Sequence, residues 1–319
     1  MRKKIFKEFD IEVKPFLKWA GGKSKLINDI EDRFPENIKE TGRIEKYFEP
    51  FIGGGALFFY LMSNYDVKES FIYDINSELI VVYKTIQNNP KQLINLLNEI
   101  KDEFIPKEHD ERKEFYLDIR KSFNENLFNF DFENYSSDFI ERAAQIIFMN
   151  KTCFNGLFRV NKKGEFNVPF GKYKNPKIFD ADNLMAASFA LKNTKIVQGS
   201  FLESEKLIDE NSLVYLDPPY RPLSKSSSFT SYSKFDFNDD DQIELSEYYK
   251  RISKIGAKAI LSNSDPKNTD ENDNFFDDLY CDFTIDRIQA PRMISCNGNE
   301  RKPVNEILVR NFCHFQKLV

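Results

Sequence analysis

The chain has 319 residues, 41% of them hydrophobic, and a formal net charge of −5. This length suits one large α/β domain with an inserted module, and the net charge excludes a nonspecific polycation but not a local basic face. We find no run of about 18 uncharged apolar residues and no apolar stretch after the basic N-terminus, so we expect neither a membrane-spanning helix nor a signal peptide. Four separated cysteines and two histidines predict no structural zinc site and indicate reduced thiols in a cytoplasmic protein.

The first motif, residues 16–23, reads Phe-Leu-Lys-Trp-Ala-Gly-Gly-Lys and precedes a helical pattern at 26–30. The Gly-Lys-Ser that begins at Gly22 is not a phosphate-binding P-loop, because Leu17 stands where that motif needs a glycine and no strand-like run precedes it. Trp19, the only tryptophan, is either a stacking platform beside the two glycines or an ordinary core residue.

A strand, a glycine-rich turn and a helix follow. We predict a strand at 44–48 and a helix at 56–62, and the turn between them reads Glu-Pro-Phe-Ile-Gly-Gly-Gly over 49–55. This arrangement lets a ligand approach bare backbone at a helix N-terminus. The next predicted strand, 70–73, ends at Asp74, near the position where an acidic residue can hold a ribose hydroxyl pair. The sequence therefore predicts a βαβ nucleoside pocket.

The middle of the chain is helical and ends in a basic hairpin. We predict helices at 79–99, 115–123 and 139–149, and then a hairpin whose strands are 157–160 and 165–168. A basic ribbon of this kind fits the DNA major groove, although an ordinary surface hairpin would look similar.

Two segments of this acidic chain are basic. Residues 1–28 contain eight basic and three acidic side chains, and residues 150–177 contain seven basic side chains and one acidic side chain. If the two segments meet, they form a polyanion-binding face; otherwise they are separate solvated loops.

The last third of the chain alternates strands and helices. We predict a helix at 180–190, a helix from 239 to 255 capped by its leading aspartates, and a mobile loop at 222–238. The predicted strands are 194–198, 212–216, 257–261, and a final pair at 280–288 and 306–312.

The strand at 212–216 ends in Asp217-Pro218-Pro219-Tyr220, because Pro218 cannot donate to a sheet ladder. Ligands bind at such strand ends in open α/β sheets, and the stiff loop offers a carboxylate, a bare carbonyl and an aromatic ring. These groups suit a planar substrate with an amino group, such as a nucleobase. The alternative is a simple strand-to-loop turn.

The motifs at 16–23, 49–55 and 217–220, in this order, resemble the Dam family of DNA adenine-N6 methyltransferases. The hairpin segment 155–173 is similar to the GATC-reading hairpin of that family, with Asn-Gly-Leu-x-Arg-x-Asn followed by Gly-Glu-Phe-Asn-Val-Pro-Phe-Gly. The tail from Ser295 to Glu306 is also similar to the family. The resemblance covers nearly the whole chain.

The resemblance implies a Rossmann-like, S-adenosylmethionine-dependent α/β methyltransferase sheet with an inserted helical and β-hairpin DNA-recognition domain. The catalytic and cofactor-binding domain would comprise 1–77 and 190–319, and the recognition domain 78–189. The partner would be double-stranded DNA, with no metal and no membrane. The biological role stays open between restriction-modification, phage and housekeeping functions. A restriction-modification role would bring a cognate restriction endonuclease as a functional partner, which need not bind to this protein.

The resemblance also implies site residues. The catalytic residues would be Asp217, Pro218, Pro219 and Tyr220. The cofactor would be bound by Trp19, Lys23, Glu49, Pro50, Phe51, Gly53, Gly55, Asp74, Ser200, Phe201 and Asp217. DNA would be bound by Lys18, Phe154, Asn155, Leu157, Arg159 and Pro169, with Phe154 at a position where the family often has an intercalating aromatic residue. Ser200 departs from the Gly-Asp-Phe of some relatives, which leaves the adenine-ring contact there open.

The mechanism follows from the chemistry of adenine. Its exocyclic amine is a poor nucleophile, because the lone pair is delocalised into the ring. Asp217 and the carbonyl of Pro218 can accept from its N–H groups, and Tyr220 can stack on the ring. The amine would then attack the methyl carbon directly and in line, after the base has been flipped out of the duplex.

Three other interpretations remain. The enzyme could methylate adenine in a sequence other than GATC, or the chain could be a DNA-binding relative without catalysis. An RNA-modifying enzyme is a third interpretation, against which the major-groove hairpin speaks.

Overall fold

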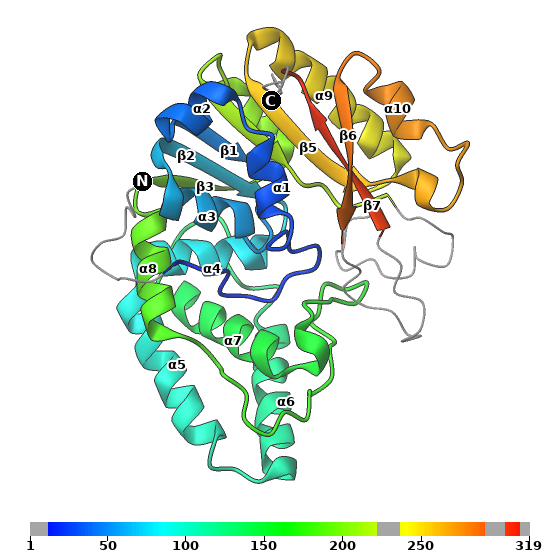
Figure 1. Ribbon diagram of the computed structural model, residues 1–319. Coiled ribbons are helices and arrows are strands. Elements are labelled where there is room, and N and C mark those ends of the chain that lie inside the picture. The colour runs from blue at the N-terminus through cyan, green and yellow to red at the C-terminus, as the bar shows by residue number, and fades with distance from the viewer. Residues whose placement is uncertain (1–11, 222–236, 291–303, 313–319) are drawn as a thin grey trace.

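The computed structural model describes residues 12–221, 237–290 and 304–312. A seven-stranded sheet occupies one end of the molecule, and its strands run in the order β3-β2-β1-β4-β5-β7-β6 (Figure 1). The strands are β1 Arg43–Glu49, β2 Asp66–Asp74, β3 Thr194–Gln198, β4 Ser212–Leu216, β5 Lys258–Ser264, β6 Thr284–Ala290 and β7 Val304–Arg310. The first five pair in parallel, and β7 joins β5 and β6 antiparallel. The sheet is a mixed, Rossmann-like α/β sheet, as the family resemblance of the sequence implies.

Both faces of the sheet are covered, so each central strand is buried on both sides. Tyr47 and Tyr215 belong to one core, with α3 and α4, whereas Phe48 and Val214 belong to the other, with α9. The helices on or beside the sheet are α1 Ile27–Asp32, α2 Glu36–Thr41, α3 Ala56–Asn64, α4 Ser77–Asn88, α8 Ala181–Leu191, α9 Asp239–Ile255 and α10 Phe275–Leu279. Every residue of β4 is buried, which explains its continuous apolar sequence.

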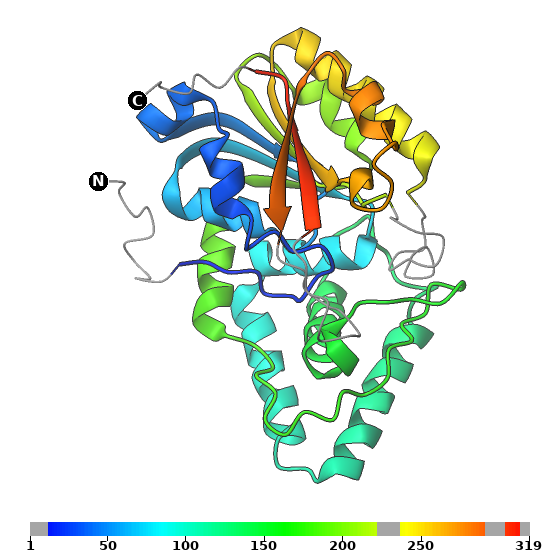
Figure 2. The same ribbon diagram turned by 45° about the vertical axis from the view of Figure 1, so that its right-hand side comes forward.

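A helical part extends from the sheet (Figure 1). It comprises α5 Pro90–Phe104, α6 His109–Glu125 and α7 Asp138–Thr152. Our prediction of one helix over 79–99 was wrong, because Pro90 lacks the N–H that would continue the helix and instead starts α5. The N-terminal segment crosses the molecule between the sheet and α7 in two views (Figures 1 and 2).

The predicted hairpin folds back on itself but does not form two regular strands. Only isolated bridges pair Val160 with Phe166 and Cys153 with Phe170. The reason is that side chains of α6 hydrogen-bond to the backbone of the second predicted strand, 165–168. The Asn124 side chain accepts from the N–H of Phe166 at 2.8 Å, and the hydroxyl of Tyr116 donates to the carbonyl of Val168 at 2.8 Å.

The remaining predictions differ in detail. The final strands pair as predicted, but β6 begins at Thr284, and the sequence did not reveal α2 or α10. The cap of α9 is Asn238, whose side chain accepts from Asp240 and Asp241. Most of the predicted loop, 222–236, lies outside the described residues. None of the described helices is both long and apolar enough to cross a membrane.

Candidate active site and DNA interface

The candidate site lies where the strand order reverses. The chain proceeds from β1 to β2 on one side and from β4 to β5 on the other, so the carboxyl ends of β1 and β4 flank the reversal. Phe48 of β1 lies opposite Val214 of β4, which brings Glu49 and the Asp217 loop together. Open α/β sheets bind ligands in the crevice at this point.

Lys23 is the direct partner of Asp217. Its Nζ lies 3.0 Å from Oδ1 of Asp217 and 4.3 Å from the centroid of the Tyr220 ring. The ammonium group also donates to the carbonyl of Gly21 at 2.7 Å, and the lysine is only 6% exposed. The first motif therefore reaches the Asp-Pro-Pro-Tyr loop, and Lys23, predicted to bind cofactor, contacts the predicted catalytic carboxylate.

The two oxygens of Asp217 have different surroundings. The hydroxyl of Ser262 donates to Oδ1 at 2.9 Å, so Oδ1 contacts both Ser262 and Lys23. No described residue donates to Oδ2 or to the carbonyl of Pro218. Burial raises the pKa of Asp217, while Lys23 and Ser262 oppose that shift. Two unused acceptors thus lie on adjacent residues, as the recognition of an amino group requires.

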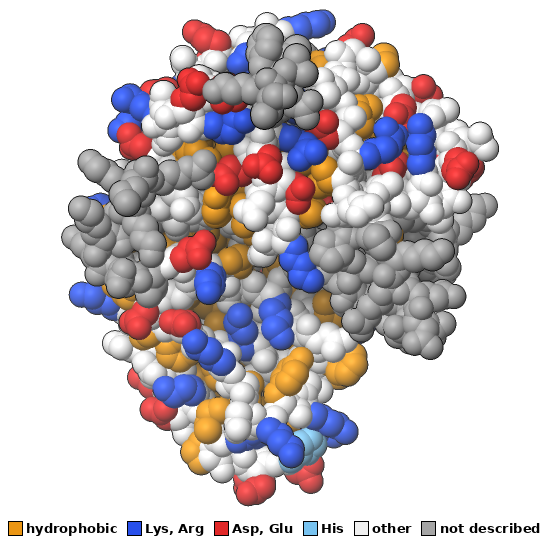
Figure 3. Space-filling model, in the orientation of Figure 1, with side chains coloured by type: hydrophobic (Ala, Val, Ile, Leu, Met, Phe, Trp, Pro, Cys, Tyr) orange, Lys and Arg blue, Asp and Glu red, His pale blue; other side chains and the backbone are white. Residues whose placement is uncertain are grey.

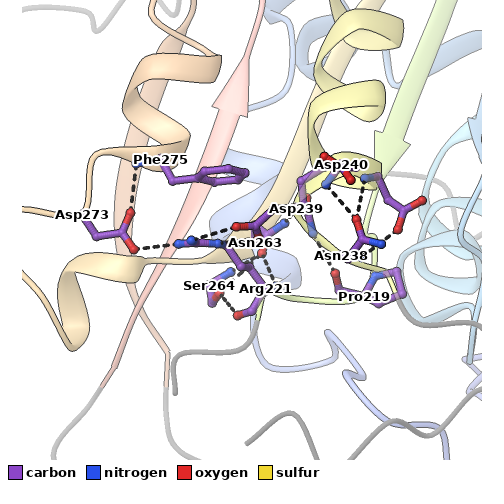
Figure 4. A network of polar contacts seen from close by, with 11 residues as sticks. Pro219, Arg221, Asn238, Asp239, Asp240, Asn263, Ser264, Asp273 and Phe275 are labelled. Carbon is purple, nitrogen blue, oxygen red and sulfur yellow. Dashed lines mark hydrogen bonds and ion pairs between the residues drawn. The ribbon is translucent and has the colours of Figure 1, made fainter. Parts of the chain in front are cut away.

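A polar network fixes the chain directly after Tyr220 (Figure 4). The guanidinium of Arg221 donates to both oxygens of Asp239, at 2.8 and 3.1 Å, and to Asp273 at 2.7 Å, and it lies 4.2 Å from the centroid of Phe275. The side chain of Gln242 donates to the carbonyl of Pro219 at 3.0 Å. The carbonyl of Pro219 is therefore used internally, in contrast to that of Pro218.

Glu306 of β7 completes the surroundings of Tyr220. The phenol donates to Oε2 of Glu306 at 2.5 Å. Burial raises the pKa of Glu306, and Lys23 and the phenol oppose the shift. Sequence reasoning noted Glu306 only in a tail similar to the Dam family. It missed Ser262, although a polar run, Ser-Asn-Ser, closes the strand that contains this residue.

Glu49 is a buried acid beside the same loop. The residue is 3% exposed, and its carboxyl group accepts from the hydroxyl of Tyr47 at 2.7 Å. Burial raises its pKa to about 8, and the charge of Asp217 adds to the shift. A ligand with a positive charge would relieve both effects, because it would favour the ionised carboxylates.

Asp74 organises the glycine turn. Its oxygens accept from the N–H of Gly53 at 3.1 Å and of Asn76 at 2.9 Å, and burial raises its pKa to about 6. A carboxylate has about four lone-pair sites, so it can still accept from a hydroxyl pair. Gly53 has φ +46°, and a Cβ there would lie 3.0 Å from the Trp19 ring. Trp19 therefore lies against the turn, where it is half-buried and packs on the edge of the core.

Aromatic rings flank the neighbouring strand ends. Phe51 stacks on Phe201 with centroids 5.5 Å apart and an interplanar angle of 29°. The hydroxyl of Ser200 accepts from the N–H of Leu202 at 3.3 Å and caps the short 3₁₀ helix Phe201–Leu207. The serine thus has a structural role as a helix cap. Among the described residues, no group of His, Cys, Asp and Glu could hold a metal ion.

The predicted DNA-binding residues gather around the start of the hairpin segment. Lys18, Phe154, Asn155, Arg159 and Pro169 are exposed, and Leu157 is half-buried. Phe154 is 55% exposed, so its ring is accessible for insertion into a base stack. Asn155 has φ +59°, a left-handed conformation that is uncommon outside glycine but that asparagine adopts more readily than most residues. The Arg159 guanidinium is aligned by Asn167, whose Oδ1 lies 2.9 Å from its Nε.

The two basic segments meet in space over their described parts. The Nζ of Lys18 lies 5.5 Å from the centroid of Tyr173, and the carboxamide of Asn150 bonds to the backbone of Lys18. Burial lowers the pKa of Lys151 to about 8, and the charges of Lys18 and Lys177 add to this shift. Lysine and arginine side chains gather across the middle of the visible face (Figure 3). The structure thus supports one basic face.

A carboxylate-Pro-Pro-Tyr loop at the reversal of an α/β sheet, with a basic face beside it, suits an enzyme that acts on nucleic acid. Residues 19–294 match the D12 class N6 adenine-specific DNA methyltransferases, and the chain belongs to this family. It is therefore an adenine-specific DNA methyltransferase, and its substrate is DNA.

Three relatives show how far the likeness extends. The chain is 50% identical to the type II methyltransferase M.MjaIII of Methanocaldococcus jannaschii, over 95% of this chain and 100% of the relative. It is 40% identical to the type II methyltransferase M1.LlaDCHI of Lactococcus lactis, over 95% and 96%. It is 33% identical to the DNA adenine methylase of Escherichia coli K12, over 92% and 93%.

The buried acid Glu49 predicts a pH-dependent stability. The folded protein keeps its proton up to a pKa of about 8, whereas the unfolded chain releases it near 4.5, so the free energy of unfolding falls as pH rises between these values. Glutamine keeps the acceptor for Tyr47 and has no proton to lose. The thermal midpoint of Glu49→Gln should exceed that of the wild type by several degrees at pH 8, and this gain should vanish near pH 4.5.

Glu45→Gln is the matched control, because Glu45 is an exposed position of the same strand. Its thermal midpoint should equal that of the wild type at every pH. A gain for Glu49→Gln that is equally large at both pH values would contradict the assigned cause.

Proposed function

We propose that this enzyme transfers a methyl group from S-adenosylmethionine to the N6 amine of adenine in GATC within duplex DNA. The observation that carries the proposal is the pair of unused acceptors at the reversal of the sheet, Oδ2 of Asp217 and the carbonyl of Pro218. They suit an amino group that must be held by two hydrogen bonds. The exposed Phe154 and Arg159, on the segment similar to the GATC-reading hairpin of the Dam family, support the target sequence.

The chemistry of the crevice fits the proposed cofactor. S-adenosylmethionine carries a sulfonium and an ammonium group, and it would supply an electrophilic methyl group. Glu49 and Asp217 are carboxylates whose pKa values are raised by burial, so positive charge next to them is favourable. Asp74 would accept from the ribose, the turn that contains Gly53 would hold the methionine end, and the Phe51 and Phe201 rings offer an apolar surface for a purine.

The protein would activate the amine without forming a covalent bond to it. Asp217 and Pro218 would accept the two N–H groups and so localise the nitrogen lone pair, while Tyr220 would stack on the base. Lys23 and Ser262 hold Oδ1 of Asp217, which leaves Oδ2 for the substrate. The hydrogen bond from Tyr220 to Glu306 fixes the ring in place. The base would have to leave the duplex to reach this site.

The hairpin segment would read the sequence, within a recognition domain that we propose to span 78–189. Arg159 has the planar fork that pairs with O6 and N7 of guanine. Lys162 and Lys163, which are exposed at the turn, would contact phosphate or nothing. Asn155, Leu157 and Pro169 would make further contacts, and Phe154 would insert between base pairs. A restriction-modification role is a further proposal, supported by the names of the two type II relatives.

The most direct test is methylation of a mixed-sequence plasmid, with the modified positions identified by sequencing. We expect N6-methyladenine at GATC alone. Asp217→Ala should abolish methyl transfer, because the amine loses its charged acceptor, while the thermal midpoint shows that the variant is folded. Modification of a different recurrent site would refute the target sequence only.

Asp209→Ala is the matched control for that variant. Asp209 is also a carboxylate paired with a lysine, Lys46 at 2.6 Å, but it lies before the amino end of the same strand. It should keep wild-type turnover. Turnover of Asp217→Ala at the rate of this control would disprove the catalytic role.

The hairpin predicts two separable effects of mutation. Arg159→Ala should cost about 1–3 kcal/mol on the preferred duplex and relax discrimination at one base pair. Lys162→Ala should weaken all duplexes equally and reduce the salt slope of binding by about one unit. The measurement is methylation of the GATC duplex and of each single-base variant at two salt concentrations. If Arg159→Ala keeps the wild-type ranking of duplexes and loses only affinity, Arg159 contacts the backbone and not a base.

A further inference from the structure

Two asparagines, one on α8 and one on α7, hold the N-terminal segment 14–23, each by clamping one backbone residue. The carboxamide of Asn183 on α8 accepts from the N–H of Lys14 at 2.8 Å and donates to its carbonyl at 2.8 Å. The carboxamide of Asn150 on α7 does the same to Lys18, at 2.9 Å in both directions. The two clamps have the same chemistry and lie four residues apart on the same segment.

Asn150 has a third contact that Asn183 lacks. Its Nδ2 also donates to the carbonyl of Gly156 at 3.2 Å, so one buried side chain bonds to both segment 14–23 and the start of the hairpin segment. The side chain of Lys18 lies against Gly156 there. A Cβ at Gly156 would lie 2.3 Å from Cδ of Lys18 and would displace that side chain, and the φ of +66° at Gly156 also favours glycine.

The same short segment reaches the catalytic carboxylate. The Trp19 ring, directly after Lys18, stacks on Phe158 of the hairpin segment with centroids 5.5 Å apart. Four residues further on, Lys23 pairs with Asp217. In both ribbon views the segment passes between the sheet and α7 (Figures 1 and 2). A displacement of the hairpin segment would therefore move Lys18 and, through a few residues of chain, Lys23.

We propose that Asn150 is a positioning residue that couples DNA recognition by the hairpin segment to the placement of Lys23 against Asp217. The inference rests on the proposed role of the hairpin segment as the sequence reader. Asn150 need not touch DNA or cofactor. Its carboxamide supplies one acceptor and two donors, which are matched here by one N–H and two carbonyls, so no other side chain of this size fills the position equally well. Coupling through Asn150 makes methyl transfer faster when the correct bases fit the reader.

The test compares Asn150→Ala with the matched control Asn183→Ala. For each variant, kcat and KM are measured on the preferred duplex and on single-base variants of it. We expect Asn150→Ala to reduce kcat on the preferred duplex roughly tenfold to a hundredfold, because a small misplacement of reacting groups is costly. The already slow rates on variant duplexes should change little. The ratio of kcat/KM between preferred and variant duplexes should therefore shrink, whereas Asn183→Ala should leave this ratio unchanged.

Asn150→Asp provides a second variant if the alanine variant does not fold. It keeps the acceptor for the N–H of Lys18 but turns an oxygen towards the carbonyls of Lys18 and Gly156, and it should also lower the discrimination ratio. An unchanged ratio in the folded Asn150 variants, or an equal loss in Asn183→Ala, would overturn the coupling. A wild-type enzyme that methylates all duplexes alike would instead refute the proposed reader, so the two failures are distinguishable.

Discussion

The ion pair between Lys23 and Asp217 is the contact on which the site depends, because it joins the N-terminal motif to the loop after the central strand. A carboxylate buried at the end of a sheet is costly in free energy unless a cation or hydrogen-bond donors meet it. Lys23 and Ser262 contact Oδ1 of Asp217, and no described residue donates to Oδ2, which is the oxygen that we propose accepts from an amino group. The same lysine lies over the ring of Tyr220, so one ammonium group orients both parts of the loop.

Two buried acids, Glu78 and Glu49, have contrasting partners. Glu78 of α4 is bonded through both oxygens to Arg142 of α7, whose guanidinium also packs against phenylalanine rings, so its partners are complete within the protein. Glu49 is hydrogen-bonded by the hydroxyl of Tyr47 and by the backbone of Phe58, but no basic side chain among the described residues pairs with it, and burial raises its pKa to about 8. The pair of Glu78 and Arg142 therefore joins α4 to α7. Burial makes the ionised form of Glu49 costly in free energy, and a cationic ligand would reduce this cost. Such incomplete satisfaction is typical of binding sites.

Local chemistry explains what the sequence predicted well and what it missed. Strands β1, β3 and β4 were predictable because a glycine or proline follows the carboxyl end of each. Glu49, Ser200 and Asp217 lie at these ends. Contacts between distant residues have no local signal, so the partners of Asp217 and the clamp of Asn150 on Lys18 appeared only in the structure. The prediction of two regular hairpin strands was wrong. An alternating pattern of apolar and polar residues cannot reveal that the side chain of Asn124 hydrogen-bonds to both the N–H and the carbonyl of Phe166.

The central claim, that buried acids at the sheet reversal await a positively charged ligand, can be tested by calorimetry. Binding of S-adenosylmethionine at pH 7 is measured in two buffers of different ionisation enthalpy. Glu49 is largely protonated before binding, and a nearby positive charge favours its carboxylate. We therefore predict that binding releases protons and that Glu49→Gln loses most of this release. A binding enthalpy that is the same in both buffers, or an undiminished release in the variant, would contradict the account.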